Sequence, residues 1–237
     1  MLIKSQRLEI DNFITIGVDI MERFSSVSMA VVRRLPKYHR YLGELLRNDV
    51  KRVSSQELSK ITGFTASQIR QDLNCFGGFG QQGYGYNVDE LYDEIGKILG
   101  LNKTYNTVII GAGNLGQAIA NYTFFEKSGF KMTAIFDVNP KLVGMKINDI
   151  PVVDVDDLEQ FINENHIEII VICTPKNQAQ KVADVINNTE IKAIWNFAPT
   201  DLKVREDIIV ENVHLSESLF TISYLLKEKE EQHKKKK

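Results

Sequence analysis

Cysteine, histidine and long apolar runs are scarce in this sequence, and each shortage narrows the class of protein. The two cysteines, Cys75 and Cys173, lie far apart in a chain of 237 residues and do not have the spacing of a metal site. No apolar run approaches the ~20 residues of a membrane span, and the apolar stretch 13–18 is too short for a signal-peptide core. We therefore expect a cytoplasmic globular protein with no metal and no membrane partner. Both cysteines are interpreted as buried thiols, with a redox role for Cys75 as the alternative.

The net charge of −2 conceals two blocks of opposite sign. Residues 23–86 carry ten Lys or Arg against four Asp or Glu, a balance of +6, whereas residues 87–226 carry eleven against twenty, a balance of −9. A polyanion is attracted to the first block and repelled by the second. The first block is therefore the candidate nucleic-acid face, and a solvated basic surface is the alternative.

Two capping boxes in the basic block predict a helix-turn-helix. Ser54-x-x-Glu57 and Thr65-x-x-Gln68 each open a short helix, and Gly63 stands where the turn between them requires a left-handed residue. The ribbon GGFGQQGYGYNV then fits two short strands joined by a hairpin. Together these elements form a winged helix, which we assign to residues 29–87. An extension over 1–28, interpreted as disordered, precedes it, and a linker helix over 88–104 follows it.

From residue 105 the chain alternates apolar strands with helices. We expect strands at TVIIGAG, KMTAIFDV, IEIIVICTP, IKAIWNFAP and DIIVENVHL, and helices at NLGQAIANYTFFEKSG, DVDDLEQFINENH and NQAQKVADVINNTE. The alternation predicts an α/β domain with a Rossmann-like parallel sheet over residues 105–215. Residues 216–237 are expected to form a helix to about Lys227 and a solvated, frayed charged tail.

The first of these strands leads into the glycine fingerprint of a dinucleotide site. Gly111, Gly113 and Gly116 are spaced for a tight turn, for close approach of a pyrophosphate and for packing of helix on strand. Asp137 ends the next strand, where a carboxylate binds ribose hydroxyls and repels a 2′-phosphate, so the expected cofactor is NADH or NAD+. The later strand ends should face the same crevice. The expected cofactor-binding residues are Gly111, Ala112, Gly113, Asn114, Leu115, Gly116, Asp137, Val138, Thr174, Pro175 and Phe197.

A catalytic apparatus is missing beyond the predicted sheet. Only residues 216–237 remain there. Of the 4 histidines, only His214 could approach a nucleotide, and no further segment is evident that would hold a substrate beside it. We therefore expect no catalytic residue and a protein that reports on its cofactor rather than an enzyme. The alternatives are a small NAD-dependent oxidoreductase with an accessory N-terminal domain and a CoA-binding or ligase-like module, which fits Asp137 less well.

The second helix of a winged helix enters the major groove, where its amino-terminal side chains meet base edges. Arg70 is suited to guanine, and Gln68 or Gln71 to adenine. Basic residues earlier in the chain are suited to phosphates, and tyrosines of the ribbon to a minor groove. The expected DNA-binding residues are Arg34, Lys37, Ser67, Gln68, Arg70, Gln71, Tyr84 and Tyr86. For each, a solvated side chain is the alternative.

Several longer segments jointly resemble the Rex family of redox-sensing transcriptional repressors. They are RRLPKYHRYL, SSQELSKITGFTASQIRQDLNCFGGFGQQGYGYNV, GAGNLGQAIANYTFF, FDVNP, NFAP and VENVHLSESLFTISYLL. The resemblance implies a homodimer of winged-helix and Rossmann domains with a domain-swapped C-terminal helix. It further implies binding to an AT-rich inverted-repeat operator when NAD+ dominates, and release when NADH binds.

The resemblance also assigns roles by position. Tyr122 and Tyr224 are implied to lie near the nicotinamide, and Arg34 to help couple the domains. Two departures weaken parts of this. Gln81 and Gln82 replace a Lys-Arg pair that is frequent in the wing of relatives, and His214 replaces a frequent aspartate. We hypothesise that His214 makes the coupling pH-sensitive, because an unperturbed histidine titrates near pH ~6.5.

Overall fold

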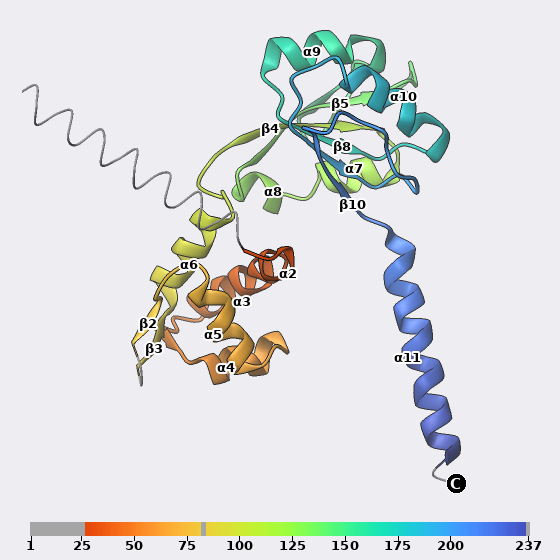
Figure 1. Cartoon of the computed structure of the whole chain (residues 1–237). Coiled ribbons are helices and arrows are strands. Elements are labelled where there is room, and N and C mark those ends of the chain that lie inside the picture. The colour runs from red at the N-terminus through yellow and green to blue at the C-terminus, as the bar shows by residue number, and fades with distance from the viewer. Residues whose placement is uncertain (1–26, 82–83, 236–237) are drawn as a thin grey trace, which may run out of the picture. The chain divides into compact units, whose positions relative to one another are not determined.

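The structure, a computed structural model, describes residues 27–81 and 84–235, which form two units (Figure 1). The first unit ends at Asn102 and the second begins at Lys103. Most of the predicted extension 1–28, and Gln82 of the wing, lie outside the described residues.

The N-terminal unit is a winged helix-turn-helix. Its elements are α2 (Met29–Val32), α3 (Leu35–Arg47), β1 (Arg52–Val53), α4 (Ser55–Thr62), α5 (Ala66–Asn74), β2 (Gly80–Gln81), β3 (Gly85–Asn87) and α6 (Val88–Ile98). The strands form a sheet in the order β1-β3-β2, in which β3 is antiparallel to both neighbours. The β2–β3 hairpin is the predicted wing. Strand β1 is too short to carry a periodic signal, and the sequence does not predict it.

The helix-turn-helix begins and turns as the capping pattern predicts. Ser54 N–H donates to Glu57 Oε2 at 2.7 Å, and Glu57 N–H donates to Ser54 Oγ at 3.2 Å, which completes the first capping box. Gly63 ends α4 with a φ of 77°. At the second predicted box only one of the two bonds is formed: Thr65 Oγ1 accepts from Gln68 N–H at 3.2 Å, without the reciprocal bond from the Gln68 side chain. The turn between α4 and α5 is therefore fixed by local hydrogen bonds at both ends.

Helix α6 belongs to the core of this unit. The buried cluster consists of Leu35, Tyr38, Leu42, Val53, Leu58, Ile69, Leu73, Tyr86, Val88, Leu91 and Ile95. Its last three members lie on one face of α6, which packs against α3. The linker role assigned to residues 88–104 thus differs from the structure, because this apolar face is buried within the first unit.

The C-terminal unit is a Rossmann-like sheet with helices on both faces (Figure 1). Its elements are β4 (Tyr105–Ile110), α7 (Asn114–Ala120), α8 (Phe124–Lys127), β5 (Phe130–Asp137), β6 (Lys146–Ile147), β7 (Ile150–Asp154), the 3₁₀ helix η1 (Val155–Asp157), α9 (Leu158–Asn165), β8 (Ile169–Ile172), α10 (Lys176–Ile186), β9 (Ala193–Asn196), β10 (Ile209–Asn212) and α11 (Leu215–Lys235). The strand order is β10-β9-β8-β4-β5-β7-β6. The chain reverses its direction of growth between β4 and β8, which is the switch point where such sheets bind ligands.

Alternate residues of the central strand β4 enter two separate cores. Val108 and Ile110 pack with side chains of α9 and α10, whereas Ile109 packs with Ile119 and Ala120 of α7. Burial on both faces explains why β4 reads as a continuous apolar run.

The structure corrects three expectations for this unit. The sheet is mixed rather than parallel, because β6 is antiparallel to β7 and joined to it through Asn148 and Asp149, whose φ angles are 48° and 63°. The helix expected from 114 to 129 breaks between α7 and α8, which leaves Tyr122 at the break. The charged tail is helical to Lys235 rather than frayed.

Helix α11 exposes its apolar residues. Leu219, Phe220 and Ile222 are 64%, 69% and 51% exposed. Tyr224, Leu225 and Leu226 are exposed as well, so this half of the helix is apolar on several sides. Among the described residues, no helix is both long enough and apolar enough to cross a membrane.

Candidate functional site

The loop after β4 is shaped by close approaches between backbone atoms. Gly111 has a φ of 103°, and a Cβ at this position would lie 2.8 Å from the carbonyl oxygen of Cys173. A Cβ on Gly116 would overlap the carbonyl oxygen of Gly111. A Cβ on Gly113 would meet nothing within 4 Å. The first and last glycines are therefore required by the fold, and Gly113 leaves the open space that a pyrophosphate requires.

Asp137, at the end of β5, holds this loop. Its Oδ2 accepts a hydrogen bond from Ala112 N–H at 2.7 Å, and its Oδ1 accepts one from Asn139 N–H at 2.8 Å. Each carboxylate oxygen has a second lone pair. The half-buried carboxylate can therefore fix the glycine loop and still accept hydrogen bonds from the two hydroxyls of a ribose.

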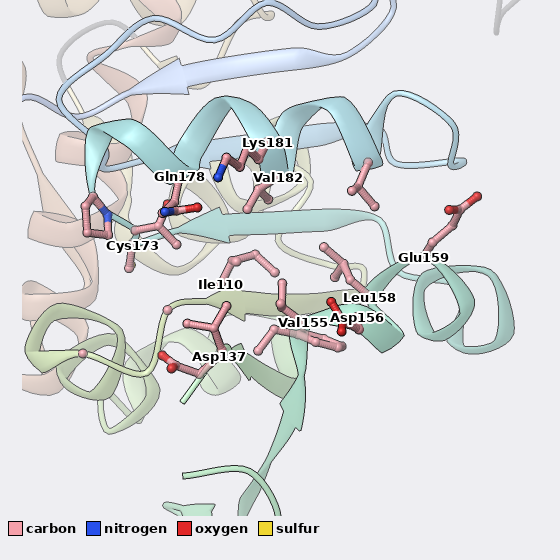
Figure 2. Close-up of a pocket in the computed structure, with 17 residues that line it drawn as sticks. Ile110, Asp137, Val155, Asp156, Leu158, Glu159, Cys173, Gln178, Lys181 and Val182 are labelled. Carbon is pink, nitrogen blue, oxygen red and sulfur yellow. The ribbon is translucent and has the colours of Figure 1, made fainter. Parts of the chain in front are cut away.

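A pocket of about 630 Å³ opens beside this loop, within the size range of small-molecule sites (Figure 2). Its lining comprises Ile110, Gly111, Gly113, Phe136, Asp137, Val138, Val155, Asp156, Leu158, Glu159, Cys173, Thr174, Pro175, Gln178, Lys181, Val182 and Val185. Figure 2 shows Asp137 on one side of the pocket and Gln178 and Lys181 on the side of α10. Apolar walls with a few polar groups are what a nucleoside requires.

Thr174 supplies an independent sign of a ligand. Its Oγ1 is buried and has no hydrogen-bond partner within the described structure. An unpaired buried hydroxyl is costly, and in a native protein it calls for an explanation. Because Thr174 lines the pocket, a polar ligand atom would satisfy this hydroxyl.

Cys173 lines this pocket as a protonated thiol. Burial raises the pKa of the Cys173 thiol to about 12, so the thiol is protonated at neutral pH. Cys75 follows α5 in the other unit and is exposed, and Cys173 is half-buried, so the expectation that both thiols are buried is wrong. Its thiol donates a hydrogen bond to the carbonyl oxygen of Gln71 at 3.3 Å.

The structure brings together only part of the predicted cofactor set. Gly111, Gly113, Asp137, Val138, Thr174 and Pro175 line the pocket. Ala112, Asn114, Leu115 and Gly116 belong to the same loop and helix but do not line it. The sequence prediction missed the wall formed by η1, α9 and α10. Residues 178, 181, 182 and 185 have the spacing of one helix face, and this period was the available signal.

The aromatic residues predicted to bind the cofactor, Phe197, Tyr122 and Tyr224, do not line this pocket. Phe197 packs edge-on against Trp195 with ring centroids 4.5 Å apart, and Trp195 contacts Phe125 at 5.5 Å. Phe125 in turn contacts Tyr122 at 5.0 Å, which makes a continuous row of rings. Tyr224 is 61% exposed on α11.

The buried amide of Asn196 holds the residues after β9. Its Nδ2 donates to the carbonyl oxygen of Thr200 and to Asn212 Oδ1, each at 2.8 Å, and its Oδ1 accepts from Ala198 N–H at 3.0 Å. These bonds join the loop that carries Phe197 to the end of β10, directly before α11.

In the N-terminal unit, the outer face of α5 is polar. Ser67, Arg70, Gln71 and Asn74 are exposed, and Gln68 is half-buried. Arg70 Nη1 donates to Ser55 Oγ at 2.9 Å. Asn74 continues the i, i+3, i+4, i+7 spacing of this face, so the helical period is a signal in the sequence that indicates it.

Two residues assigned to DNA have different surroundings. The side chain of Arg34 is engaged by Asp72 and is only 18% exposed, so its guanidinium is not a free phosphate ligand. Tyr86 is 9% exposed and belongs to the core, because alternation along β3 turns its ring inward. Tyr84, by contrast, is 70% exposed. Lys37 is half-buried, with its ammonium nitrogen 4.9 Å from the centroid of the Phe64 ring.

Two protein families match the two units. The family described as putative DNA-binding protein N-terminus matches residues 26–74, and the family described as CoA binding domain matches residues 102–200. The first match covers the helix-turn-helix, and the second covers the sheet and the pocket. Neither family alone spans the whole chain.

Longer relatives match both units together. A protein of Caldanaerobacter subterraneus subsp. tengcongensis, named redox-sensing transcriptional repressor Rex, is 67% identical over 210 residues, which are 89% of this chain and 94% of the relative. The protein of the same name from Clostridium tetani is 62% identical over 211 residues, which are 89% of this chain and 100% of the relative.

Solved structures agree with these relatives. RSP in complex with beta-NAD+ and operator DNA is 68% identical, with a TM-score of 0.82, over 89% of this chain and 97% of that chain. RSP in complex with beta-NADH is 65% identical, also with a TM-score of 0.82, over 90% of this chain and 99% of that chain. RSP is described as a Rex-family repressor. At this identity and coverage, the chain belongs to the Rex family of redox-sensing transcriptional repressors.

Proposed function

We infer that this chain is a redox-sensing transcriptional repressor that binds operator DNA through its N-terminal unit and NADH or NAD+ in its C-terminal unit. One observation carries the inference: RSP, 68% identical with a TM-score of 0.82, was solved with both NAD+ and operator DNA. The relatives are repressors by name, so the function is to sense the cofactor and not to turn over a substrate. The cytoplasm, where DNA and the nicotinamide pool meet, is the proposed location.

The dinucleotide is proposed to bind along the glycine loop. Gly113 leaves room for the pyrophosphate, and Asp137 accepts hydrogen bonds from the adenosine ribose and repels a 2′-phosphate. Thr174 Oγ1 donates to a ligand oxygen, which supplies the partner that it lacks. The residues proposed to hold NAD(H) remain Gly111, Ala112, Gly113, Asn114, Leu115, Gly116, Asp137, Val138, Thr174, Pro175 and Phe197, with Tyr122 and Tyr224 at the nicotinamide.

Discrimination between the two cofactor forms is proposed to arise at the ring. NAD+ carries a positive charge on its nicotinamide ring, and desolvating that charge is costly, whereas the dihydronicotinamide ring of NADH is neutral and can be buried at lower cost. The row formed by Tyr122, Phe125, Trp195 and Phe197 is the environment that makes this difference. NADH therefore favours a closed arrangement, and DNA and NADH oppose each other by the same factor.

The repressor is proposed to act as a homodimer. Leu219, Ile222 and Leu226 are each more than half exposed on α11, and a helix that is apolar on several sides requires a covering surface. A second copy of the chain, which receives α11 as a swapped helix, supplies that surface. Two recognition helices related by a twofold axis then match an AT-rich inverted repeat with half-sites about one helical turn apart.

DNA binding is proposed to use the outer face of α5 together with the wing. Ser67, Gln68, Arg70 and Gln71 read base edges, with Asn74 at the end of the same face. Lys37 contacts a phosphate, and the exposed Tyr84 approaches a minor groove. The winged helix is proposed to span 29–87 and the nucleotide-binding domain 105–215.

Fluorescence anisotropy tests this function. The labelled probe is the duplex that the wild-type protein selects from a random library, titrated with protein in the presence of NAD+ or NADH. We expect tight binding with NAD+ and loss of binding with NADH. Equal binding with both forms, or steady oxidation of NADH by small carbonyl compounds, would overturn the proposal.

Thr174→Val is the matched variant for the cofactor site. It removes only the unpaired hydroxyl and keeps the shape of the side chain. We expect unchanged DNA binding without cofactor and a NADH dissociation constant raised about three- to tenfold, the value of one ordinary hydrogen bond. If Thr174→Val raised the melting temperature and left NADH affinity unchanged, the hydroxyl would have no ligand role.

A further inference from the structure

The recognition helix α5 carries a buried acidic residue held by Arg34, the N-cap residue of α3, and by Tyr38 within α3. Arg34 Nε donates to Asp72 Oδ2 at 2.7 Å, and Arg34 Nη2 donates to Asp72 Oδ1 at 2.6 Å, which is a bidentate pair. Tyr38 Oη also donates to Asp72 Oδ2, at 2.7 Å. The side chain of Asp72 is 3% exposed. All of its strong contacts therefore come from one neighbouring helix.

This anchor lies directly behind the polar face of α5. Asp72 is buried together with Ile69 and Leu73, on the side of α5 opposite the exposed Ser67, Arg70 and Gln71. The other buried contacts of α5 are apolar, from Ala66, Ile69 and Leu73. Apolar packing has no direction and tolerates small rotations, whereas a planar bidentate pair fixes both distance and angle.

The amino-terminal end of α5 is attached to the same cluster. Phe64, directly before the N-cap Thr65, meets the Tyr38 ring edge-on, with centroids 5.7 Å apart. The guanidinium carbon of Arg34 lies 5.9 Å from the centroid of the Phe64 ring. Arg34 and Tyr38 thus contact α5 itself through Asp72, and they contact the turn before α5 through Phe64. The same two side chains therefore hold both ends of α5.

Charge burial of this kind does not primarily serve stability. Removing two charges from water costs about as much as their attraction returns, and apolar replacements of buried pairs are often neutral or stabilising. Such pairs are best attested where they select one geometry among several close ones. Here the geometry concerned is the rotation of the helix that carries the base-reading side chains.

We propose that Arg34 and Asp72 are a positioning pair that sets the rotation of α5 and thereby the sequence discrimination of the DNA-binding unit. Arg34 is then not a phosphate ligand. The proposal rests on the inferred function only in taking α5 as the helix that reads bases. It assigns a specificity role to two residues that do not touch DNA.

The test compares binding to two duplexes by fluorescence anisotropy, using the full-length protein with NAD+. One duplex is that selected by the wild-type protein, and the other is a scrambled duplex of equal length and composition. Asp72→Asn removes one partner of the pair but none of the positive charge. We expect affinity for the selected duplex to fall at least about fivefold, the lower value of one bidentate base contact. Affinity for the scrambled duplex should stay within about twofold, because the phosphate contacts are intact.

Removing single positive charges at the start of α3 distinguishes a positioning role from a phosphate contact. Arg34→Met removes one charge at the N-cap of α3, and Lys37→Met removes one from its first turn. A lost phosphate contact weakens both duplexes alike and lowers the slope of log affinity against log salt by about one. We expect Arg34→Met to leave this slope and the scrambled duplex unchanged and to reduce only the affinity for the selected duplex. If Arg34→Met weakened both duplexes alike, or if Asp72→Asn kept full discrimination, the proposal would be wrong.

The double variant Arg34→Met, Asp72→Leu guards against simple unfolding. It replaces the pair by apolar groups and leaves no uncompensated charge, so we expect the melting transition and NADH binding to be retained while discrimination is lost. Full discrimination in this folded variant would overturn the proposal. The wild-type protein tests the inferred function separately: that function is wrong if the wild-type protein selects no duplex, or if NADH does not change its DNA binding.

Discussion

Substitution of two glycines in one loop by alanine should separate cofactor binding from folding. At Gly116, a Cβ would overlap the backbone oxygen of Gly111, so α7 must move away from β4. Overpacking of this kind costs about 1–3 kcal/mol or more. For a domain of this size we expect Gly116→Ala to lower the melting temperature by about 5–10 °C. At Gly113, whose φ is −71°, alanine fits the backbone and its Cβ meets nothing within 4 Å.

Gly113→Ala should therefore change binding far more than stability. Its Cβ occupies the space proposed for the pyrophosphate, so charged hydrogen bonds from the loop, each about 1.5–3 kcal/mol, are lengthened or lost. We expect a NADH dissociation constant raised about 10- to 100-fold, measured by NADH fluorescence, with a melting temperature within about 2 °C of wild type. Unchanged NADH affinity in Gly113→Ala would place the pyrophosphate elsewhere. Equal thermal losses in both variants would refute the division of roles.

Three further predictions concern groups outside that loop. Burial lowers the pKa of His39, against a smaller opposing effect of Asp93, so the unfolded chain binds its proton more strongly than the folded one. Stability should thus fall as pH drops below about 6.5, and His39→Gln, which removes the titrating group, should flatten that dependence in pH-resolved thermal melts. Cys75 should react rapidly with a thiol reagent at pH 8 and Cys173 only after denaturation, because burial raises the pKa of Cys173 to about 12; two fast thiols in the native protein would contradict this. Leu219→Asp with Leu226→Asp should convert a dimer to monomers in sedimentation velocity, whereas Glu230→Asp, a conservative change in the charged end of the same helix, should not.

Local signals in the sequence predicted local structure well. Ser54, Glu57 and Gly63 define the helix-turn-helix through hydrogen bonds and a φ angle that involve near neighbours only. The glycine fingerprint located the pocket partly for the same reason, since Gly116 is required by its contact with Gly111 in the same loop, whereas Gly111 is required by the carbonyl oxygen of Cys173 after β8. The capping signals and the Gly116 contact are independent of how distant elements pack.

Expectations that depended on distant packing were less accurate. Arg34 reads as a surface cation because its partner Asp72 lies 38 positions away in the sequence. Tyr86 reads as exposed because the glycines around it conceal the inward turn of β3. The hairpin after β6 uses Asn148 and Asp149 rather than the Asn-Gly pair that marks such turns most clearly. The first of these depends on a residue distant in the sequence, and the other two on strands too short to carry a clear pattern.

The exposed apolar residues of α11 imply that the stability of the protein depends on its concentration in the cell. If covering that helix requires a second copy, the free energy gained is available only to pairs, and stability then depends on total concentration by mass action. A cell with few copies would hold a larger share of single chains, which proteases remove first. If two copies exchange α11, a truncated chain lacking this helix would receive the helix of an intact chain without returning one, and an excess of truncated chains would leave few intact pairs.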